Sequence, residues 1–288
     1  MLFDFGDSEK IGKLTLEDFT VFRDLILEKS GIKIRDNRVD YLEYRVKERM
    51  LVHSLVDYRE YYFKLKYDEA GPDSELQELI NLVTVHETSF FRHPDQLDTL
   101  RDLVLKRIIE DKEKIGNTSL RMWSAVCATG EEPLTLAMMI KEYFPQLKRW
   151  SVSITATDIS TAALEKAKKG VFGDNSFRAP LEDIKNKYFK KVDSRYHAVD
   201  EIKRMVTHKI VNLSDIDSLD KYRDMDLILC RNVFIYFPDE VKEAIAKKFY
   251  EIMPRGGALI LGNAEVLDVK RIPFKLEFHR GGPVYTKV

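Results

Sequence analysis

The residues best suited to chemistry follow two apolar runs of this chain. The first run, Leu120–Cys127, leads into Thr129-Gly130-Glu131-Glu132, and the second, Val152–Thr157, ends at Asp158. In a parallel sheet, ligands bind outside the carboxyl ends of the strands. Gly130 permits a tight turn there, and the helix expected next presents free N–H groups. A carboxylate such as Asp158 can bind both hydroxyls of a ribose. The pattern therefore predicts a nucleoside-type ligand.

The turn between the first run and its helix narrows the class of ligand. A dinucleotide fold uses G-x-G-x-x-G, whereas the corresponding positions here are Val126, Ala128 and Gly130. A single glycine argues against a pyrophosphate at this turn, and the two glutamates that follow favour a ligand with a cation. S-adenosylmethionine matches, because it has adenine, ribose and a sulfonium but no phosphate. The alternative is that the glutamates only stabilise a helix amino terminus and that Asp158 caps the next helix.

A third apolar run, Asp226–Cys230, ends at Arg231-Asn232 and continues into the aromatic stretch Phe234–Phe237. A cation and an amide at the end of a buried strand are poorly placed for packing and well placed for a ligand. The alternative is a set of core aromatic residues with one ion-paired arginine. Because three apolar runs end in polar residues, we prefer the ligand interpretation.

A fourth polar group lies in the stretch H-E-T-S-F-F-R, His86–Arg92. Thr88 and Arg92 are four residues apart, so one face of a helix would present both. A lone histidine such as His86 is more often structural than catalytic. The sequence has no Ser-His-Asp pattern and no cluster with metal-ligand spacing, so we expect no metal site.

The elements that position these residues change in type along the chain. Residues 14–83 have the apolar spacing of helices, with stops at Ser30-Gly31 and Gly71-Pro72. From Leu120 onward, short apolar runs alternate with helix-like segments, which is typical of a doubly wound α/β sheet. Residues 171–212 break that alternation and predict a small inserted β-meander, built from Tyr188-Phe189, Tyr196–Val199 and Met205–Val211.

Composition limits the class of protein. The chain has 288 residues, of which 44% are hydrophobic and 33% charged, which is enough for one large core and a small second domain. A net charge of −1 gives no basic footprint for nucleic acid. Cys127 and Cys230 both lie in apolar runs, which favours a reducing cytoplasm over a disulfide framework. No apolar run approaches the length of about 18 residues that a membrane span needs, so we expect a cytoplasmic protein, and we expect a monomer.

Taken together, these residues resemble the CheR family of chemotaxis receptor methyltransferases over almost the whole chain. The resemblance is carried by six ordered blocks, which are T-V-H-E-T-S-F-F-R at 84–92, W-S-A-V-C-A-T-G-E-E-P at 123–133, A-T-D-I at 156–159, N-L at 212–213, C-R-N-V-F-I-Y-F at 230–237 and G-G-A-L-I-L-G-N-A-E at 256–265. The resemblance implies a helical amino-terminal domain over residues 1–85, a linking helical region over 86–119 and a Rossmann-like methyltransferase domain over 120–288. A small antiparallel β-subdomain is expected within residues 171–212.

The resemblance also implies a function, which is methyl transfer from S-adenosylmethionine to glutamate side chains of chemoreceptors, giving glutamyl methyl esters. Matched position by position, the family's cofactor contacts fall on His86, Thr88, Arg92, Glu131, Asp158, Asn212, Leu213, Arg231 and Asn232. We place the ribose on Asp158, the adenine near Asn212-Leu213 and the methionine moiety near Glu131. Arg92 could pair with the cofactor carboxylate, and Tyr236 is expected beside the transferred methyl group.

The chemistry of such a transfer makes few demands on the protein. A glutamate carboxylate has an ordinary pKa of about 4.3, so it is already a nucleophile at neutral pH and needs no general base. The sequence lacks N-P-P-Y, the signature of amide and amine methyltransferases, which favours a carboxylate acceptor.

Two positions depart from the family pattern. His86 stands where the family usually has asparagine, and Val126 stands where alanine or glycine is usual. Imidazole replaces one amide hydrogen bond but not a donor and an acceptor at the same angle. Two other functions are therefore kept as alternatives, a non-enzymatic module that binds S-adenosylmethionine or its demethylated product, and a small-molecule methyltransferase.

Receptor recognition is expected in two places. Arg38, Arg45 and Arg49 form one stripe on the second helix, where the family is thought to meet the acidic helices of receptors; the alternative is a solvated helix face. In some members the β-subdomain binds a receptor pentapeptide by strand addition, and those members share a glycine-bearing loop. The corresponding stretch here, Lys190–Ala198, has no glycine, so we expect a pentapeptide-independent enzyme.

Overall fold

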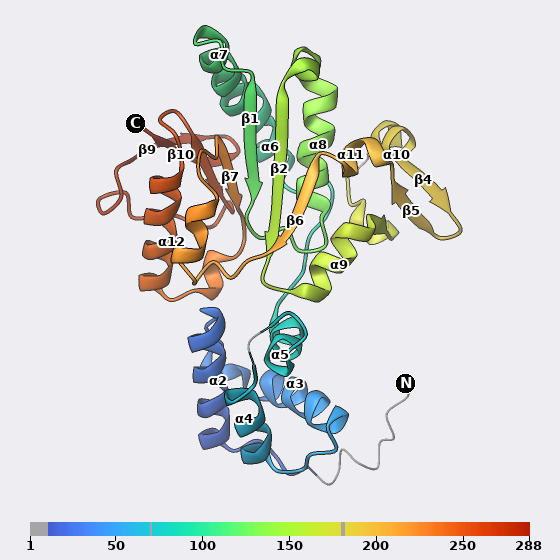
Figure 1. Ribbon diagram of the computed structural model, residues 1–288, viewed down its shortest axis with the longest axis vertical. Coiled ribbons are helices and arrows are strands. Elements are labelled where there is room, and N and C mark those ends of the chain that lie inside the picture. Colours follow the sequence, from blue (N-terminus) through green and yellow to red (C-terminus); the bar gives the residue numbers. More distant parts are fainter. Residues whose placement is uncertain (1–10, 70, 180–181) are drawn as a thin grey trace. The chain divides into compact units, whose positions relative to one another are not determined.

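The computed structural model describes residues 11–69, 71–179 and 182–288, and contacts divide the chain into two compact units (Figure 1). Of the described residues, those through Val85 together with 159–161 and 236–238 form the first unit, and the others form the second. None of the helices in the described ranges is long and apolar enough to cross a membrane.

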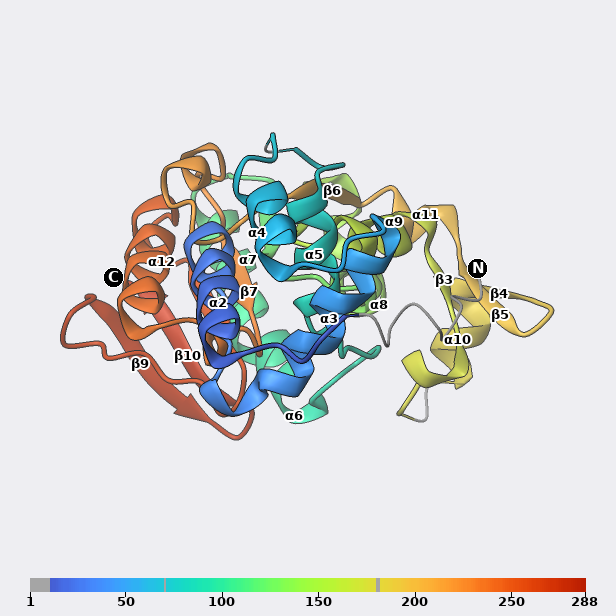
Figure 2. The ribbon, with the colours of Figure 1, turned by 90° about the horizontal axis from the view of Figure 1, so that it is seen from below.

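The first unit is built from helices that pack side by side, as Figure 2 shows. Its helices are α2 (Leu16–Ser30), the short 3-10 helix η1 (Asp36–Arg38), α3 (Val39–Val52), α4 (Tyr58–Lys66) and α5 (Glu75–Val83). The Thr15 side chain caps α2 by accepting from the backbone N–H of Asp18, and Gly31 ends that helix with a φ of 73°. That left-handed conformation suits glycine and confirms the stop predicted at Ser30-Gly31.

A buried carboxylate organises the interior of the helical unit. Glu75, 8% exposed, accepts two hydrogen bonds from the Arg49 guanidinium at 2.9 and 2.6 Å. The Tyr61 hydroxyl donates to the same carboxylate at 2.7 Å, and a His53 ring nitrogen lies 2.6 Å from it. Arg49 is therefore an internal partner of Glu75 rather than a free member of the predicted basic stripe. Arg38 and Arg45 lie over the ring of Tyr41, at 4.7 and 3.8 Å from its centroid.

The second unit contains a seven-stranded sheet in the order β6-β2-β1-β7-β8-β10-β9. The first five strands of that order pair in parallel, and β10 and β9 run antiparallel at one edge. Their bounds are β1 Ser119–Ser124, β2 Ser151–Asp158, β6 Val206–Ile210, β7 Leu227–Cys230, β8 Ala258–Leu261, β9 Phe274–His279 and β10 Gly282–Lys287. The predicted α/β sheet is confirmed.

Helices cover both faces of this sheet, so its central strands are buried on both sides. Helix α8 packs against β1, β2 and β6. On the other face, Trp123 of β1 stacks on Tyr222 and meets Phe249 of α12 edge-on. The remaining helical segments are α6 Pro94–Thr99, the π-helix η2 Leu100–Leu105, α7 Lys106–Lys114, α8 Glu131–Tyr143, η3 Pro145–Arg149, α9 Thr161–Lys169, α11 Asp200–Lys203, η5 Asp217–Lys221, η6 Phe234–Tyr236 and α12 Asp239–Ile252.

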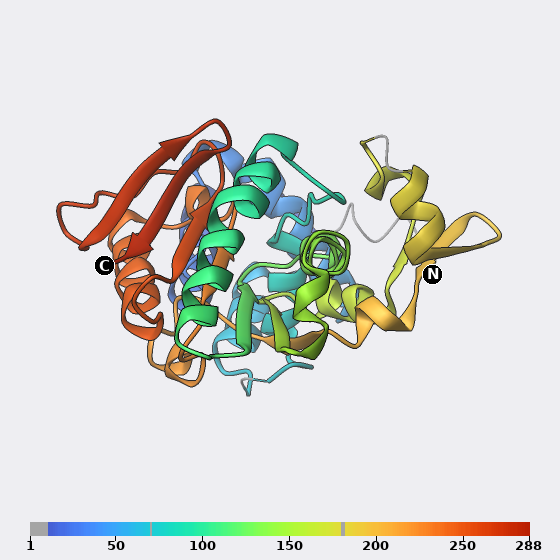
Figure 3. The same ribbon diagram turned by 90° about the horizontal axis from the view of Figure 1, so that it is seen from above.

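An inserted subdomain lies between α9 and α11, and Figure 3 shows it projecting from the second unit at the end opposite the β9–β10 hairpin. Its elements are β3 Val171–Phe172, η4 Asp174–Ser176, α10 Glu182–Tyr188, β4 Phe189–Val192 and β5 Arg195–Ala198, and its sheet has the order β3-β5-β4. The predicted third strand, Met205–Val211, was assigned to the wrong sheet. Val206–Ile210 pairs in parallel with β2 and forms an edge of the large sheet.

Aromatic rings join the insert to the stretch His86–Arg92. The Phe90 ring lies 4.8 Å from Phe172, 4.9 Å from Phe177 and 4.9 Å from Phe189 between centroids. The backbone N–H of Phe90 also donates to the carbonyl of Ser176 at 2.8 Å. Phe90 is 1% exposed, so the insert and this stretch share one core.

Candidate active site

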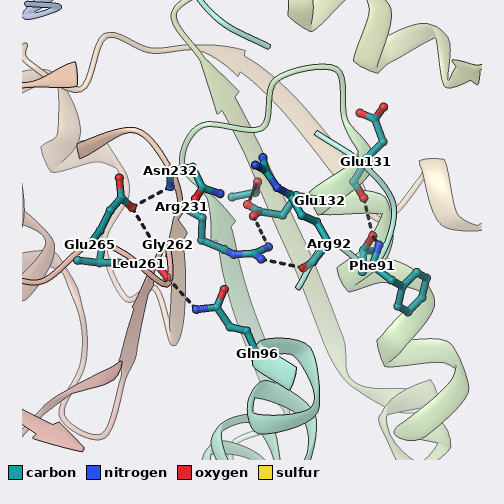
Figure 4. Close-up of polar contacts among 12 residues, drawn as sticks. Phe91, Arg92, Gln96, Glu131, Glu132, Arg231, Asn232, Leu261, Gly262 and Glu265 are labelled. Atoms are coloured by element: carbon teal, nitrogen blue, oxygen red, sulfur yellow. Dashed lines mark hydrogen bonds and ion pairs between the residues drawn. The ribbon is translucent and has the colours of Figure 1, made fainter. Parts of the chain in front are cut away.

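The polar residues predicted at three strand ends meet at one edge of the large sheet. Strands β1, β2 and β7 run parallel and in register, so their carboxyl ends share that edge. Glu131, Glu132, Arg231 and Asn232 lie there, and Arg92 lies beside them (Figure 4). The sequence prediction that these residues converge is confirmed by the strand order.

The turn after β1 is tight because two residues adopt left-handed conformations. Ala128 has a φ of 46° and Gly130 a φ of 98°. A Cβ placed on Gly130 would lie 2.8 Å from the Cβ of Ala167, so the missing side chain lets the turn rest on α9. Gly130 therefore permits the turn to approach α9 of the protein closely. The Asp158 carboxylate accepts a 2.9 Å hydrogen bond from the Ala128 N–H, which joins the ends of β1 and β2.

Glu131 is the first residue of α8 and is 3% exposed. Its carboxylate accepts from the Thr129 hydroxyl at 2.7 Å and from the Ser176 hydroxyl at 2.8 Å. A buried charge needs such donors, and the amino terminus of α8 stabilises it further. Ser176 belongs to the insert, and its hydroxyl was not predicted to reach this edge.

Glu132 pairs with Arg231, and both side chains are nearly buried, at 12% and 4% exposed. The ion pair measures 3.0 Å, and the Ser124 hydroxyl donates to the other Glu132 oxygen at 2.6 Å. Arg231 also donates to the backbone carbonyl of Arg92 at 2.8 Å (Figure 4). The predicted cofactor contact Arg231 thus fixes the backbone that carries Arg92. The adjacent glutamates in the sequence did not indicate which of them takes the arginine.

Asn232 follows with a φ of 60°, and its backbone N–H donates to the Glu265 carboxylate at 2.8 Å. Glu265 is 4% exposed and comes from the turn after β8. It was part of the family block at 256–265 but not among the predicted site residues. The short hydrogen bond makes it a neighbour of the site (Figure 4).

The stretch His86–Ser89 forms neither helix nor strand and leads into a turn at Phe90-Phe91, rather than forming the expected helix. Thr88 and Arg92 therefore do not share a helical face. Arg92 donates to the backbone carbonyl of Glu87 at 2.6 Å. Burial lowers the pKa of His86 below its ordinary value, partly opposed by the negative charge of Asp158. The imidazole is therefore neutral at neutral pH.

Asn212 and Leu213 follow β6, next to the end of β2. The Val211 N–H donates to the backbone carbonyl of Asp158 at 3.0 Å, which brings this stretch beside the predicted ribose contact. The Asn212 amide oxygen accepts from the N–H and hydroxyl of Ser214 at 3.0 and 2.7 Å. Leu213 is 3% exposed. Tyr236, in contrast, belongs to the first compact unit, where its carbonyl accepts from the Lys33 N–H at 2.7 Å.

The site has the chemistry that S-adenosylmethionine requires. Two buried nitrogens at this edge, His86 Nε2 and Arg231 Nε, have no hydrogen-bond partner among the described residues. Glu131 and Asp158 provide negative charge for a cationic cofactor. Residues 11–69, 71–179 and 182–288 contain no cluster of histidine, cysteine and carboxylate side chains suited to a metal.

Comparison with known proteins shows the family of this chain. The family model for the CheR methyltransferase SAM binding domain matches residues 86–281, and the model for the CheR methyltransferase all-alpha domain matches residues 17–84. Chemotaxis protein methyltransferase 2 of Vibrio cholerae is 34% identical, over 95% of this chain and 94% of that protein. A chemotaxis protein methyltransferase of Borreliella burgdorferi is 29% identical, over 88% of this chain and 89% of its own length. The chain belongs to the CheR family of S-adenosylmethionine-dependent methyltransferases.

Proposed function

We propose that the protein methylates glutamate side chains in the cytoplasmic helices of chemoreceptors and forms glutamyl methyl esters. The observation that carries this proposal is the state of the site's own ionisable groups. Glu131 and Glu132 accept hydrogen bonds from neighbouring donors, and His86 is neutral and largely buried. These groups bind and position, and none is needed to remove a proton. A carboxylate acceptor, which carries no proton at neutral pH, suits such a site.

Each predicted contact has a proposed part in holding the cofactor. Asp158 binds the ribose, Asn212-Leu213 border the adenine, and Glu131 lies near the methionine moiety. His86 and Thr88 complete this set of contacts. Bound there, the cofactor supplies a methyl group activated by a sulfonium.

The remaining contacts surround the reacting groups. Arg92 donates to the Glu87 carbonyl with one nitrogen, and its other donors are proposed to bind the cofactor carboxylate. Arg231 and Asn232 border the site. The protein's contribution is alignment and exclusion of water.

Receptor recognition is proposed to use η1, which ends at Arg38, and the exposed part of α3 that follows it. Arg38 is exposed and Arg45 is half-buried, whereas Arg49 is held by Glu75. Arg38 and Arg45 are therefore proposed to meet the acidic receptor helices. The β4–β5 turn has Asp193 at a φ of 52°, a conformation that glycine adopts readily. We propose that this enzyme acts in the cytoplasm as a monomer and does not need a receptor pentapeptide.

Incubation with methyl-labelled cofactor and chemoreceptor cytoplasmic fragments tests the proposed reaction. We expect base-labile label on receptor glutamates, and no label when the modified glutamates are replaced by alanine. Fragments with and without a carboxy-terminal pentapeptide should be labelled at the same rate. Cofactor binding by calorimetry without label on any receptor would overturn the proposal and favour a non-enzymatic binding module. Label on small molecules alone would favour a small-molecule methyltransferase.

A further inference from the structure

A buried carboxylate, Glu265, holds together the loops that follow β7 and β8. Its Oε2 accepts from the Asn232 N–H and from the Gly262 N–H, each at 2.8 Å, and its Oε1 accepts from the Ile235 N–H at 3.3 Å. The Glu265 N–H donates back to the Gly262 carbonyl at 2.8 Å and closes the turn. Three backbone donors on one carboxylate that is 4% exposed form a rigid junction, and Figure 4 shows the bonds from Asn232 and Gly262.

The junction acts on the conformation of Asn232. Its φ of 60° lies in the left-handed region, which asparagine tolerates but which needs support from the surroundings. The Glu265 carboxylate provides that support by accepting from the Asn232 N–H. Gly262 leaves room for this arrangement, because a Cβ at that position would lie 2.6 Å from the Asn232 amide oxygen, 2.8 Å from Glu265 Oε2 and 2.9 Å from the Asn232 backbone nitrogen.

We propose that Glu265 is a positioning residue for cofactor binding, which holds Asn232 in its left-handed conformation at the edge of the site. The inference rests on the proposed contact between Asn232 and the cofactor. The Glu265 carboxylate bonds to the backbone N–H groups of Asn232 and Ile235. Its effect on binding therefore passes through Asn232 and through the course of residues 232–235.

The same strand provides a matched control. Asp226 immediately precedes β7, at the opposite end from Asn232, and is 2% exposed. It also caps backbone, accepting from the Arg121 N–H at 2.8 Å, and pairs with Lys112 at 2.8 Å. Asp226 and Glu265 are thus both buried carboxylates that bind a backbone N–H near β7, and they differ in their distance from the site.

Calorimetry with S-adenosylhomocysteine tests the proposal on Glu265→Gln, Asp226→Asn, Asn232→Ala and the double variant Asn232→Ala/Glu265→Gln. Glu265→Gln keeps the size of the side chain but loses one acceptor, and we expect it to weaken affinity about tenfold. In turnover assays, KM for S-adenosylmethionine should rise by a similar factor while kcat changes less than about twofold. Asp226→Asn should lower the thermal unfolding midpoint and leave affinity unchanged.

The double variant shows whether Glu265 acts through Asn232. If it does, adding Glu265→Gln to Asn232→Ala weakens affinity by less than about twofold, because the two sites are coupled. If the affinity losses of the two single variants add in the double variant, or if Glu265→Gln binds with unchanged affinity, the inference about Glu265 is overturned and the proposed contact of Asn232 is not. An unchanged affinity in Asn232→Ala would overturn the proposed contact itself and the inference with it. Gly262→Ala, which presses a Cβ on both Asn232 and the Glu265 carboxylate, supplies a second variant that should weaken binding if Glu265→Gln does not fold.

Discussion

The Ser176 hydroxyl donates a 2.8 Å hydrogen bond to the buried carboxylate of Glu131. Ser176 comes from the inserted subdomain, and Glu131 begins the helix that follows the proposed cofactor turn. The insert is therefore bonded directly to a residue of the candidate site. A second link, from the Phe90 N–H to the Ser176 carbonyl, fixes the serine in place.

Ser176→Ala should weaken S-adenosylhomocysteine binding between about threefold and tenfold, since one hydrogen bond to a charged group is lost. Glu131 then keeps only the Thr129 hydroxyl as a side-chain donor among the described residues. Calorimetry measures the change. Ser218→Ala, which removes an exposed hydroxyl bonded to the Asp215 carbonyl, is the control and should bind normally. Equal affinities in the two variants would contradict a role of the insert in the site.

Asp158→Ala should reduce cofactor affinity by more than about a hundredfold, because two charge-assisted hydrogen bonds to ribose are removed. It also removes the cap on the Ala128 N–H, so a small loss of thermal stability is expected. Asp158→Asn separates the two effects, because the amide oxygen still caps Ala128 but cannot accept from both hydroxyls. A variant Asp158→Asn with normal affinity would show that the ribose is placed wrongly.

The buried Glu132–Arg231 pair should be costly to break on one side. Glu132→Gln leaves Arg231 charged and poorly paired, and we expect a loss of about 3 kcal/mol in the free energy of unfolding. Urea denaturation followed by fluorescence measures it. The double variant Glu132→Gln/Arg231→Met removes the uncompensated charge and should recover part of the loss. If Glu132→Gln and the unmodified protein unfold at the same urea concentration, the pair is not buried as described.

Stability should depend on pH through His86. Burial lowers the pKa of His86 below 6.5, so the unfolded chain binds this proton more tightly than the folded one. The stabilisation from the neutral imidazole is present above pH 6.5 and is lost as the pH falls below that value. His86→Asn should therefore flatten the decline of the unfolding free energy between about pH 7 and pH 5. If the unfolding free energies of His86→Asn and the unmodified protein change equally with pH, the role of His86 is contradicted.

Replacing Arg49 should destabilise the helical unit, whereas replacing Arg38 should leave its stability nearly unchanged. Arg49→Ala leaves the buried Glu75 without its bidentate partner and should lower the unfolding free energy by about 3 kcal/mol. Arg38→Ala should leave stability nearly unchanged, because the side chain is exposed, and should slow receptor methylation. Normal stability of Arg49→Ala would return this arginine to the set of proposed receptor contacts.

The sequence was informative where local chemistry decides structure. Gly31, with its left-handed φ, ends α2 where the Ser30-Gly31 pair predicted it. The alternation of apolar runs predicted the parallel strands that bring Glu131, Asp158 and Arg231 to one edge. These features depend on residue type and period, which are visible in a single chain.

The features that escaped prediction depend on tertiary pairing. Val206–Ile210 is apolar only at its two ends, so its sequence does not indicate which sheet it joins, and its parallel pairing with β2 is decided by the large sheet. Glu265 gave no local sign of its role, because its donors at Asn232 and Ile235 come from a different loop. The partner of Glu132 lies 99 positions away in the chain.

The shared core of Phe90 with the insert has a consequence for local unfolding. Opening the insert would expose Phe90 and break the bond between its N–H and the Ser176 carbonyl. Backbone amides in residues 88–92 and in β3–β5 should therefore exchange with deuterium as one cooperative unit rather than as separate loops. The stability of the projecting subdomain then determines how often the segment carrying Thr88 and Arg92 unfolds locally.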